Sequence, residues 1–111
     1  MARVIKFRQP VFVKDQFKYW HYWGYINNDF VGGLLTQPES QQFTGLRDVH
    51  DKEIYEGDID ELGRVVVFKN GAWMFEHHES TNHSDHIHPD RARFIKIIGN
   101  IHENPELLKP N

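Results

Sequence analysis

The chain of 111 residues contains no cysteine. It can therefore hold neither a disulfide framework nor a thiolate nucleophile nor a zinc–thiolate site. Its apolar runs all fall far short of the roughly 20 residues that a membrane-spanning helix needs, and no signal peptide precedes the first apolar segment. From these absences we expect a cytoplasmic protein without a membrane partner.

A strong excess of positive charge is also absent, because the net charge is −3 with the histidines neutral. The usual electrostatic footprint of a nucleic-acid-binding protein is therefore missing. The charge is nevertheless uneven: five basic residues and one acidic residue give residues 1–20 a charge of +4, whereas two basic and seven acidic residues give residues 47–63 a charge of −5. Such segments can bring two copies of the chain together or simply keep it soluble, and both interpretations stay open.

Recognisable catalytic patterns are missing as well. The chain has no G-x-S-x-G nucleophile elbow, no phosphate-binding glycine loop and no dinucleotide-binding glycine fingerprint. Nothing in the sequence therefore argues for an enzyme, and no cofactor is expected.

Short apolar segments with the period of a β-strand are abundant. Gly, Pro, Asn and Asp separate these segments, a pattern typical of a small barrel or sandwich. Gln9-Pro10 is expected to end the first strand, because proline removes a donor from the ladder. The expected strands are 4–8, 17–26 (as one long strand or a hairpin), 30–31, 42–46, 64–68, 72–75 and 93–98.

Asn70-Gly71, between residues 64–68 and 72–75, is the clearest turn signal in the chain. Both residues accept the positive φ of a type I′ turn, so a β-hairpin is predicted here. Residues 76–90 are expected to be polar and without regular structure, and residues 105–109 to form a short helical turn.

Residues 42–48 read Q-F-T-G-L-R-D, and residues 52–59 read K-E-I-Y-E-G-D-I. Together they resemble the signature of the YopX family, small proteins mostly encoded by phages and prophages and without an established activity. Ile5-Lys6-Phe7-Arg8, Trp23-Gly24-Tyr25-Ile26 and the segment 98–108 match further family phrases in the same order.

The resemblance implies one YopX-like domain over residues 1–111, acting in the cytoplasm of a bacterial host cell. It further implies an SH3-like barrel at residues 42–111, with residues 1–41 as an N-terminal β extension. The chain departs from the pattern at Val49-His50-Asp51, where relatives have an Asn-Gly turn, and at Asp60, where they have an apolar residue. The histidine-rich segment at residues 77–88 lies outside the family pattern.

The signature has two interpretations. In the first, its glycines allow the chain to bend and its polar side chains cap neighbouring amides, as barrel corners require. In the second, Asp48, Glu53, Glu56 and Asp58 form a carboxylate cluster that binds a divalent cation or acts as an acid–base pair. The signature residues are Thr44, Gly45, Leu46, Asp48, Tyr55, Glu56, Gly57 and Asp58.

Five of the eight histidines lie between residues 77 and 88, with Asp85 among them. Imidazoles and a carboxylate suit zinc or another divalent metal, bound for stability or for catalysis. Alternatively, the segment is a solvated loop that joins the hairpin to the last strand. The candidate metal ligands are His77, His78, His83, His86 and His88.

An aromatic block at residues 17–26 follows a basic first strand. Its aromatic rings could stack nucleobases. Strand alternation, however, places Tyr19, His21, Trp23 and Tyr25 on one face and Trp20, Tyr22 and Gly24 on the other, so at least one face is expected in a core or an interface. The nucleic-acid alternative uses Arg3, Lys6, Arg8, Lys18, Trp20 and Trp23.

The sequence as a whole favours a non-enzymatic interaction or assembly module that forms a homo-oligomer, with an unidentified protein partner as a further option. A nucleic-acid-binding module and a metal-binding protein are the alternatives.

Overall fold

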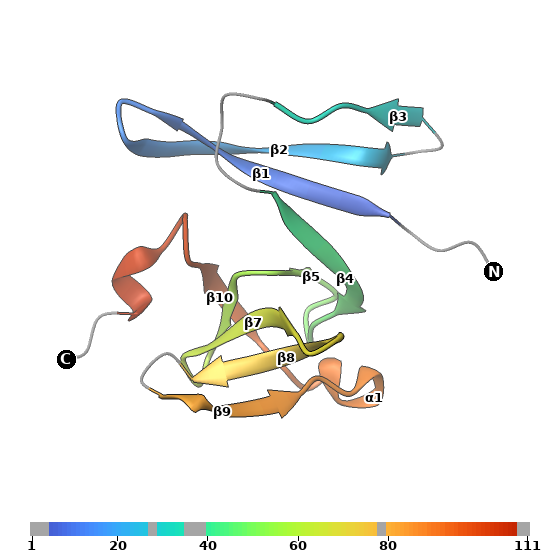
Figure 1. Ribbon diagram of the computed structural model, residues 1–111, viewed down its shortest axis with the longest axis vertical. Helices are drawn as coiled ribbons and strands as arrows, with labels where there is room; N and C mark the ends of the chain where they lie inside the picture. Colours follow the sequence, from blue (N-terminus) through green and yellow to red (C-terminus); the bar gives the residue numbers. More distant parts are fainter. Residues whose placement is uncertain (1–4, 27–28, 35–39, 78–79, 109–111) are drawn as a thin grey trace. The chain divides into compact units, whose positions relative to one another are not determined.

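The computed structural model describes residues 5–26, 29–34, 40–77 and 80–108, and for residues 80–84 it describes the backbone alone (Figure 1). The described chain is mainly β, as expected. In this part of the chain no helix is long and apolar enough to cross a membrane. The strands are β1 (Lys6–Val13), β2 (Gln16–Ile26), β3 (Asp29–Val31), β4 (Gln41–Arg47), β5 (Glu53–Tyr55), β6 (Asp58–Asp60), β7 (Arg64–Lys69), β8 (Ala72–His77), β9 (Ser80–His86) and β10 (Ile97–Asn100), with a one-turn helix α1 (Pro89–Ala92) and a 3-10 turn at Pro105–Leu108.

The strands form two antiparallel sheets, with the orders β3-β2-β1-β4-β5 and β10-β6-β7-β8-β9. The chain divides into two compact units, Met1–Phe43 and Thr44–Asn111, and the division falls within β4. Neither sheet closes on itself within the described residues, so the expected SH3-like barrel is not confirmed.

In the first unit, β1 pairs with β2 from Lys6 opposite Gly24 to Val13 opposite Gln16. The predicted end of the first strand at Gln9-Pro10 is wrong, because β1 runs through the proline. β1 pairs with β4 only at Phe7 and Arg8. Beyond Arg8 one edge of β1 therefore has no ladder partner among the described residues, and a proline is tolerated there.

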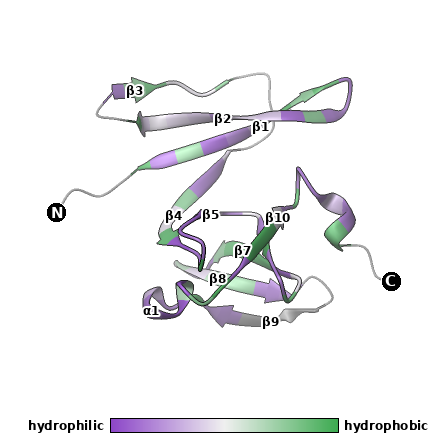
Figure 2. Ribbon diagram, turned by 180° about the vertical axis from the view of Figure 1, so that it is seen from behind, coloured by the Kyte–Doolittle hydropathy of each residue, from purple (hydrophilic) through white to green (hydrophobic). Residues whose placement is uncertain are grey.

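The second unit has its own core, in which Ile54, Val66 and Phe75 are almost fully buried. Ile87, Ala92 and Ile97 complete the core from the segments that follow β8. Figure 2 shows β10 as a strongly hydrophobic strand and β9, at the other edge of the same sheet, as a hydrophilic one. Ile54 and Ile59, which flank the acidic corner of the signature, are both 0% exposed.

The predicted hairpin is confirmed. β7 and β8 pair from Arg64 opposite His77 to Lys69 opposite Ala72. Asn70 has φ of 54° and Gly71 has φ of 79°, the left-handed geometry that this two-residue turn needs.

Two local expectations in the second unit are wrong. Residues 76–90 were expected to lack structure, yet residues 80–86 form β9 and Pro89–Ala92 form α1. The free edge of β8 supplies backbone partners to β9, and this pairing outweighs the low strand propensity of its polar side chains. The last strand begins at Ile97 instead of Arg93, because Phe94 and Ile95 donate backbone hydrogen bonds to Arg91 and Ala92 in the turn that follows α1.

Candidate functional site

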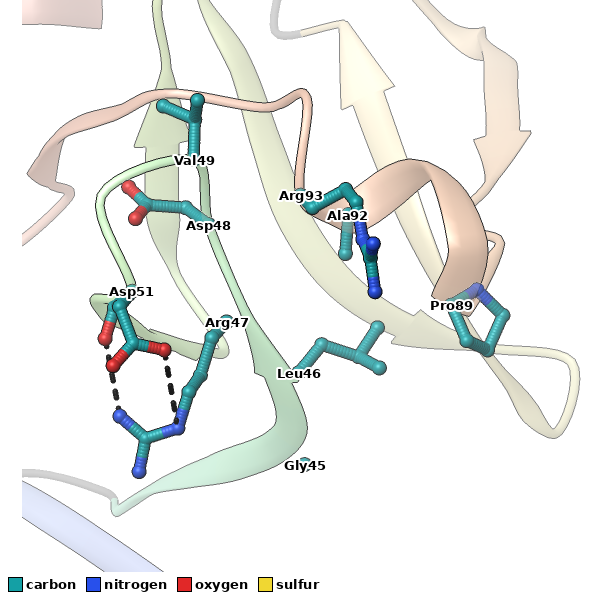
Figure 3. Close-up of a pocket in the computed structure, with 9 residues that line it drawn as sticks. All are labelled: Gly45, Leu46, Arg47, Asp48, Val49, Asp51, Pro89, Ala92 and Arg93. Atoms are coloured by element: carbon teal, nitrogen blue, oxygen red, sulfur yellow. Dashed lines mark hydrogen bonds and ion pairs between the residues drawn. The ribbon is translucent and has the colours of Figure 1, made fainter.

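A cavity of about 610 Å³ lies in the second unit, between the end of β4 and α1 (Figure 3). We call it the β4–α1 cavity. Signature residues Gly45, Leu46 and Asp48 line one side of it, and the side chains of α1 line the other. Its full lining is Gly45, Leu46, Arg47, Asp48, Val49, Asp51, Pro89, Ala92 and Arg93.

Asp48 is buried and holds three backbone amides. Its Oδ1 accepts from the N–H groups of His50 and Lys52, both at 2.9 Å, and its Oδ2 accepts from that of Ile97 at 3.0 Å. Burial alone would raise the pKa of Asp48, but these backbone hydrogen bonds outweigh it and lower the pKa below its usual range. Asp48 is therefore an ionised structural clamp that joins the loop after β4 to the start of β10.

Arg47 is the half-exposed cation of the same cavity. Its Nη1 donates to the backbone carbonyl of Asp51 at 3.0 Å, and its Nε lies 3.9 Å from the Asp51 carboxylate (Figure 3). Its Nη2 lies 3.6 Å from Glu53. Exposed pairs of this kind contribute little stability, so Arg47 organises the loop without anchoring the fold.

Thr44 and Gly45 shape the middle of β4. The Thr44 hydroxyl donates to the carbonyl of Ile54 at 2.8 Å and accepts from the N–H of Leu46 at 3.1 Å. Gly45 has φ of 88°, which side chains rarely adopt, and a Cβ added there would meet no atom within 4 Å. Gly45 therefore serves the backbone conformation and not close packing.

The acidic corner at Glu56-Gly57-Asp58 is also built from backbone contacts. Asp58 is 1% exposed. Its Oδ2 accepts from the N–H of Tyr55 at 2.7 Å, and its Oδ1 accepts from the side-chain amide of Asn100 at 2.9 Å. Gly57 turns the chain with φ of 84°; its N–H donates to the carbonyl of Val66, and its carbonyl accepts from the N–H of Ile101.

Three of the four carboxylates that could have formed a cluster bind separate partners. Asp48 binds amides near β10, Asp58 binds Tyr55 and Asn100, and Glu53 accepts from the Tyr55 hydroxyl at 3.0 Å. Within the described residues, no group of three or more His, Asp or Glu side chains is placed to hold a metal ion. The geometry therefore favours the interpretation of the signature as corner chemistry.

Sequence reasoning missed a buried ion pair next to the signature. Asp60 is 1% exposed, and its Oδ2 accepts from Arg64 Nε at 2.9 Å and lies 2.7 Å from Arg64 Nη2. Its Oδ1 accepts from the N–H groups of Leu62 and Arg64 at 3.1 and 2.8 Å. The available signal was the acidic Asp60 followed four residues later by Arg64, with Gly63 as a turn residue between them.

The candidate metal ligands are only partly described. His78 lies outside the described residues, as does the side chain of His83. His77 Nε2 lies 3.6 Å from Asp85, whereas the rings of His86 and His88 lie 6.5 Å apart and line a different pocket. The described candidate ligands therefore lie in two places, with His77 near Asp85 and with His86 and His88 in that pocket.

The residues of the nucleic-acid alternative are divided between the two faces of the first sheet. Trp20 pairs with Pro10 and Trp23 with Phe7, so successive register places the two indoles on opposite faces. The Arg8 guanidinium lies 3.9 Å over the Trp20 ring, and the Lys6 ammonium lies 5.1 Å over the Phe43 ring. Arg3 lies outside the described residues, and Lys18 is exposed.

Trp23 is held on its own face. Its ring stacks on Phe7 with a centroid distance of 4.4 Å, and its Nε1 donates to Ser40 at 2.9 Å. On the same face, the Gln9 side chain exchanges two hydrogen bonds with the backbone of Leu34, and His21 Nε2 lies 2.8 Å from the Gly32 carbonyl. The segment after β3 thus covers the centre of this face, and the two indoles do not form one stacking platform.

A search of curated proteins finds no match to the chain. A family model described as YopX protein matches residues 14–109. The match spans nearly the whole chain and includes every signature residue described above, so this protein belongs to the YopX family.

Proposed function

We propose that this protein is a non-enzymatic interaction or assembly module that forms a homo-oligomer in the cytoplasm of a bacterial host, as a phage or prophage product. The observation that carries the proposal is the edge of the first sheet. β3 is the terminal strand, and its Phe30 is 65% exposed. Tyr25, its register partner on β2, is 59% exposed and contacts it edge-on at 5.6 Å.

An exposed edge strand offers backbone groups for pairing with a second strand. Phe30 and Tyr25 add an aromatic surface of the kind that concentrates binding energy in interfaces. The two-fold pairing of β3 with the β3 of a second copy would continue the sheet and place the Phe30 rings of the two copies next to each other on one face. The engaged carboxylates of the signature support a role without catalysis, because they bind backbone amides. We also propose that the second unit is an SH3-like barrel.

Light scattering coupled to size exclusion tests the proposal. The wild-type chain is expected to run as an oligomer, and Phe30→Ser is expected to shift it to monomer at micromolar concentration. Leu62→Ser is the matched control, because Leu62 is 70% exposed in the second unit and lies away from the β3 edge in sequence. A wild-type chain that stays monomeric at both low and high salt would refute the homo-oligomer.

Nucleic-acid binding is the second candidate, supported by the basic first strand and by Lys18, which is exposed and lies two residues before Trp20 in β2. It predicts binding that weakens steeply with salt. Fluorescence anisotropy with single- and double-stranded probes is the measurement, and the absence of binding at low salt would eliminate this candidate.

Metal binding is the third candidate, supported by the density of histidines between residues 77 and 88. Elemental analysis of untagged protein tests it. Stoichiometric zinc would support it, whereas metal-free protein of unchanged stability would reject it.

A further inference from the structure

A second cavity, of about 390 Å³, lies next to α1 in the same unit and is lined by Arg91 of that helix. We call it the β8–α1 pocket. It lies apart from the signature, since no residue of the family signature lines it. Its lining residues are Arg64, Phe75, His86, Ile87, His88, Arg91, Phe94 and Ile95.

The inner part of this pocket is apolar. Phe75 is 3% exposed and Ile87 is 8% exposed, so both present side chains that belong to the core. Phe94 also lines the pocket, yet it is 72% exposed. Covering this exposed ring with a flat or aliphatic group is favourable, because apolar surface is removed from water.

The polar side chains among the described lining residues are two arginines and two histidines, which can donate hydrogen bonds or carry positive charge. Arg64 is held by two bonds to the Asp60 carboxylate, and its guanidinium carbon lies 4.3 Å over the Phe75 ring. His86 and His88 place their rings 6.5 Å apart, each with ring nitrogens able to donate or accept. Arg91 is exposed, and its side chain makes no hydrogen bond or ion pair with the residues that the structure describes.

Carboxylates meet this lining at one point. Asp60 binds Arg64, and Asp85 lies 3.9 Å from Arg64 Nη1 and 3.6 Å from His77. Both therefore compensate the charge of Arg64, whereas Arg91 is exposed and has no acidic partner among the described residues. Among the residues that the structure describes, the pocket thus combines one guanidinium without an acidic partner, two imidazoles and an apolar floor, and none of its described lining residues is acidic.

We propose that the β8–α1 pocket binds an oxyanion, a carboxylate or a phosphate, carried on an aromatic or aliphatic body. Arg91 pairs with the anion, because a guanidinium presents a planar fork of donors that matches an oxyanion. His86 or His88 donates a further hydrogen bond. Phe94 covers the apolar body of the ligand against Phe75 and Ile87.

The size of the pocket agrees with this ligand class. A volume of about 390 Å³ lies in the lower part of the range that small-molecule sites occupy. It accommodates a group such as the C-terminal residue of a peptide or a phosphorylated aromatic ring, and this proposal is independent of the oligomer proposed above.

Amide chemical shifts of the full chain, followed by NMR during titration, test the proposal. The probes are N-acetyl-phenylalanine, its uncharged amide, phenyl phosphate and inorganic phosphate. We expect N-acetyl-phenylalanine or phenyl phosphate to shift the amides of residues 86–95, with the uncharged amide binding about tenfold more weakly or worse, since it loses a charge-assisted contact. The stronger of the two anions identifies the source of the oxyanion.

Substitutions then test whether the pocket residues, and not neighbouring residues, bind the anion. Arg91→Gln is expected to weaken binding of the anion about tenfold, and Phe94→Ser to weaken binding of the organic anions without changing that of inorganic phosphate. Arg93→Gln is the matched control, because Arg93 lies on the same turn but lines the β4–α1 cavity. Three results would each overturn the proposal. They are equal binding of the acid and its amide, equal loss of binding in Arg91→Gln and Arg93→Gln, and no chemical-shift changes with any probe at a concentration on the order of 10 mM, where even weak binding is detected.

Discussion

Replacing Asp48 by asparagine changes one oxygen of a carboxylate into an amide nitrogen at a site where three backbone N–H groups converge. Oδ1 of an asparagine can still accept from the N–H groups of His50 and Lys52, as Asp48 does. The amide nitrogen then faces the N–H of Ile97, which the wild-type Oδ2 accepts at 3.0 Å. Donor would face donor, and Ile97 is only 6% exposed, so water cannot readily replace the lost acceptor.

The magnitude follows from the burial of this one amide. A buried donor without a partner costs about 1–3 kcal/mol, and hydrogen bonds to a charged acceptor are stronger than those to a neutral one. His50 and Lys52 are exposed, so their amides can find water in any relaxed arrangement. We therefore expect Asp48→Asn to lower the free energy of unfolding by about 2–3 kcal/mol at pH 7.

The same clamp predicts a pH dependence. Because the pKa of Asp48 is lowered in the folded state, the unfolded chain binds more protons in the acidic range. The contribution of Asp48 is therefore complete above its ordinary value of 3.8 and is lost as the pH falls through the lowered folded-state pKa. Asp48→Asn should remove this part of the acid sensitivity, so the difference between the two proteins narrows below pH 4.

Urea unfolding and amide hydrogen exchange measure this prediction together. Exchange at the Ile97 amide should accelerate in Asp48→Asn beyond the effect on the rest of β10. Asp51→Asn is the control: Asp51 is exposed in the same loop, pairs with Arg47 only at 3.9 Å, and has φ of 62°, which asparagine tolerates. The reasoning fails if Asp48→Asn and Asp51→Asn both stay within about 0.5 kcal/mol of wild type.

Three further predictions concern single residues of the second unit. Asn100→Ala should lower the free energy of unfolding by about 2–4 kcal/mol, because it removes the amide donor from the buried Asp58 carboxylate. Urea unfolding measures this loss, and a loss under about 0.5 kcal/mol would contradict the prediction. Gly45→Ala should lower the free energy of unfolding by about 1 kcal/mol in thermal unfolding, because its φ of 88° disfavours a side chain. Gly32→Ala is the control and should be neutral, because its φ is not positive and an added Cβ would meet no atom within 4 Å. Equal effects of the two substitutions would show that the backbone conformation is not the cause. Burial lowers the pKa of His102 below 6.5, so its contribution to stability is complete above pH 6.5 and declines as the pH falls through the folded-state pKa. His102→Gln should remove this decline below pH 6.5, and an equal dependence of the unfolding free energy on pH in both proteins would refute the assignment.

Local chemistry in the sequence was sufficient where a structural choice depended on a few adjacent residues. Asn70-Gly71 predicted its own hairpin, because the turn requires positive φ at both positions and few residue types accept it. The turn at Glu56-Gly57-Asp58 follows the same logic. Strand alternation likewise placed Trp20 and Trp23 on opposite faces of β2, as their register partners on β1 show.

Local chemistry was insufficient where a partner distant in sequence decided the outcome. The residues of β9 look like a solvated loop, and they become a strand because the β8 edge provides the hydrogen bonds. Pro10 looks like a strand end, and it stays within β1 because β4 pairs with only the first part of that strand.

The candidate site shows the same division. Its residue types and order identified the YopX family and made corner chemistry the simpler interpretation of Thr44, Gly45 and Asp58. The partners of the carboxylates came only from folding: the Ile97 amide lies 49 residues from Asp48, and Asn100 lies 42 residues from Asp58. No spacing rule links positions so far apart.

The sequence by itself determined the β character of the chain, the turn at Asn70-Gly71, the family and the absence of any thiol chemistry. These follow from side-chain type and short-range backbone preference, which act before the chain is folded. Only the tertiary structure decided that Asp48, Asp58 and Asp60 bind amides and an arginine, and that Arg91 and Phe94 line one pocket. Burial and long-range hydrogen bonding set those outcomes, because a charged group removed from water must take whatever partner the packed chain brings to it.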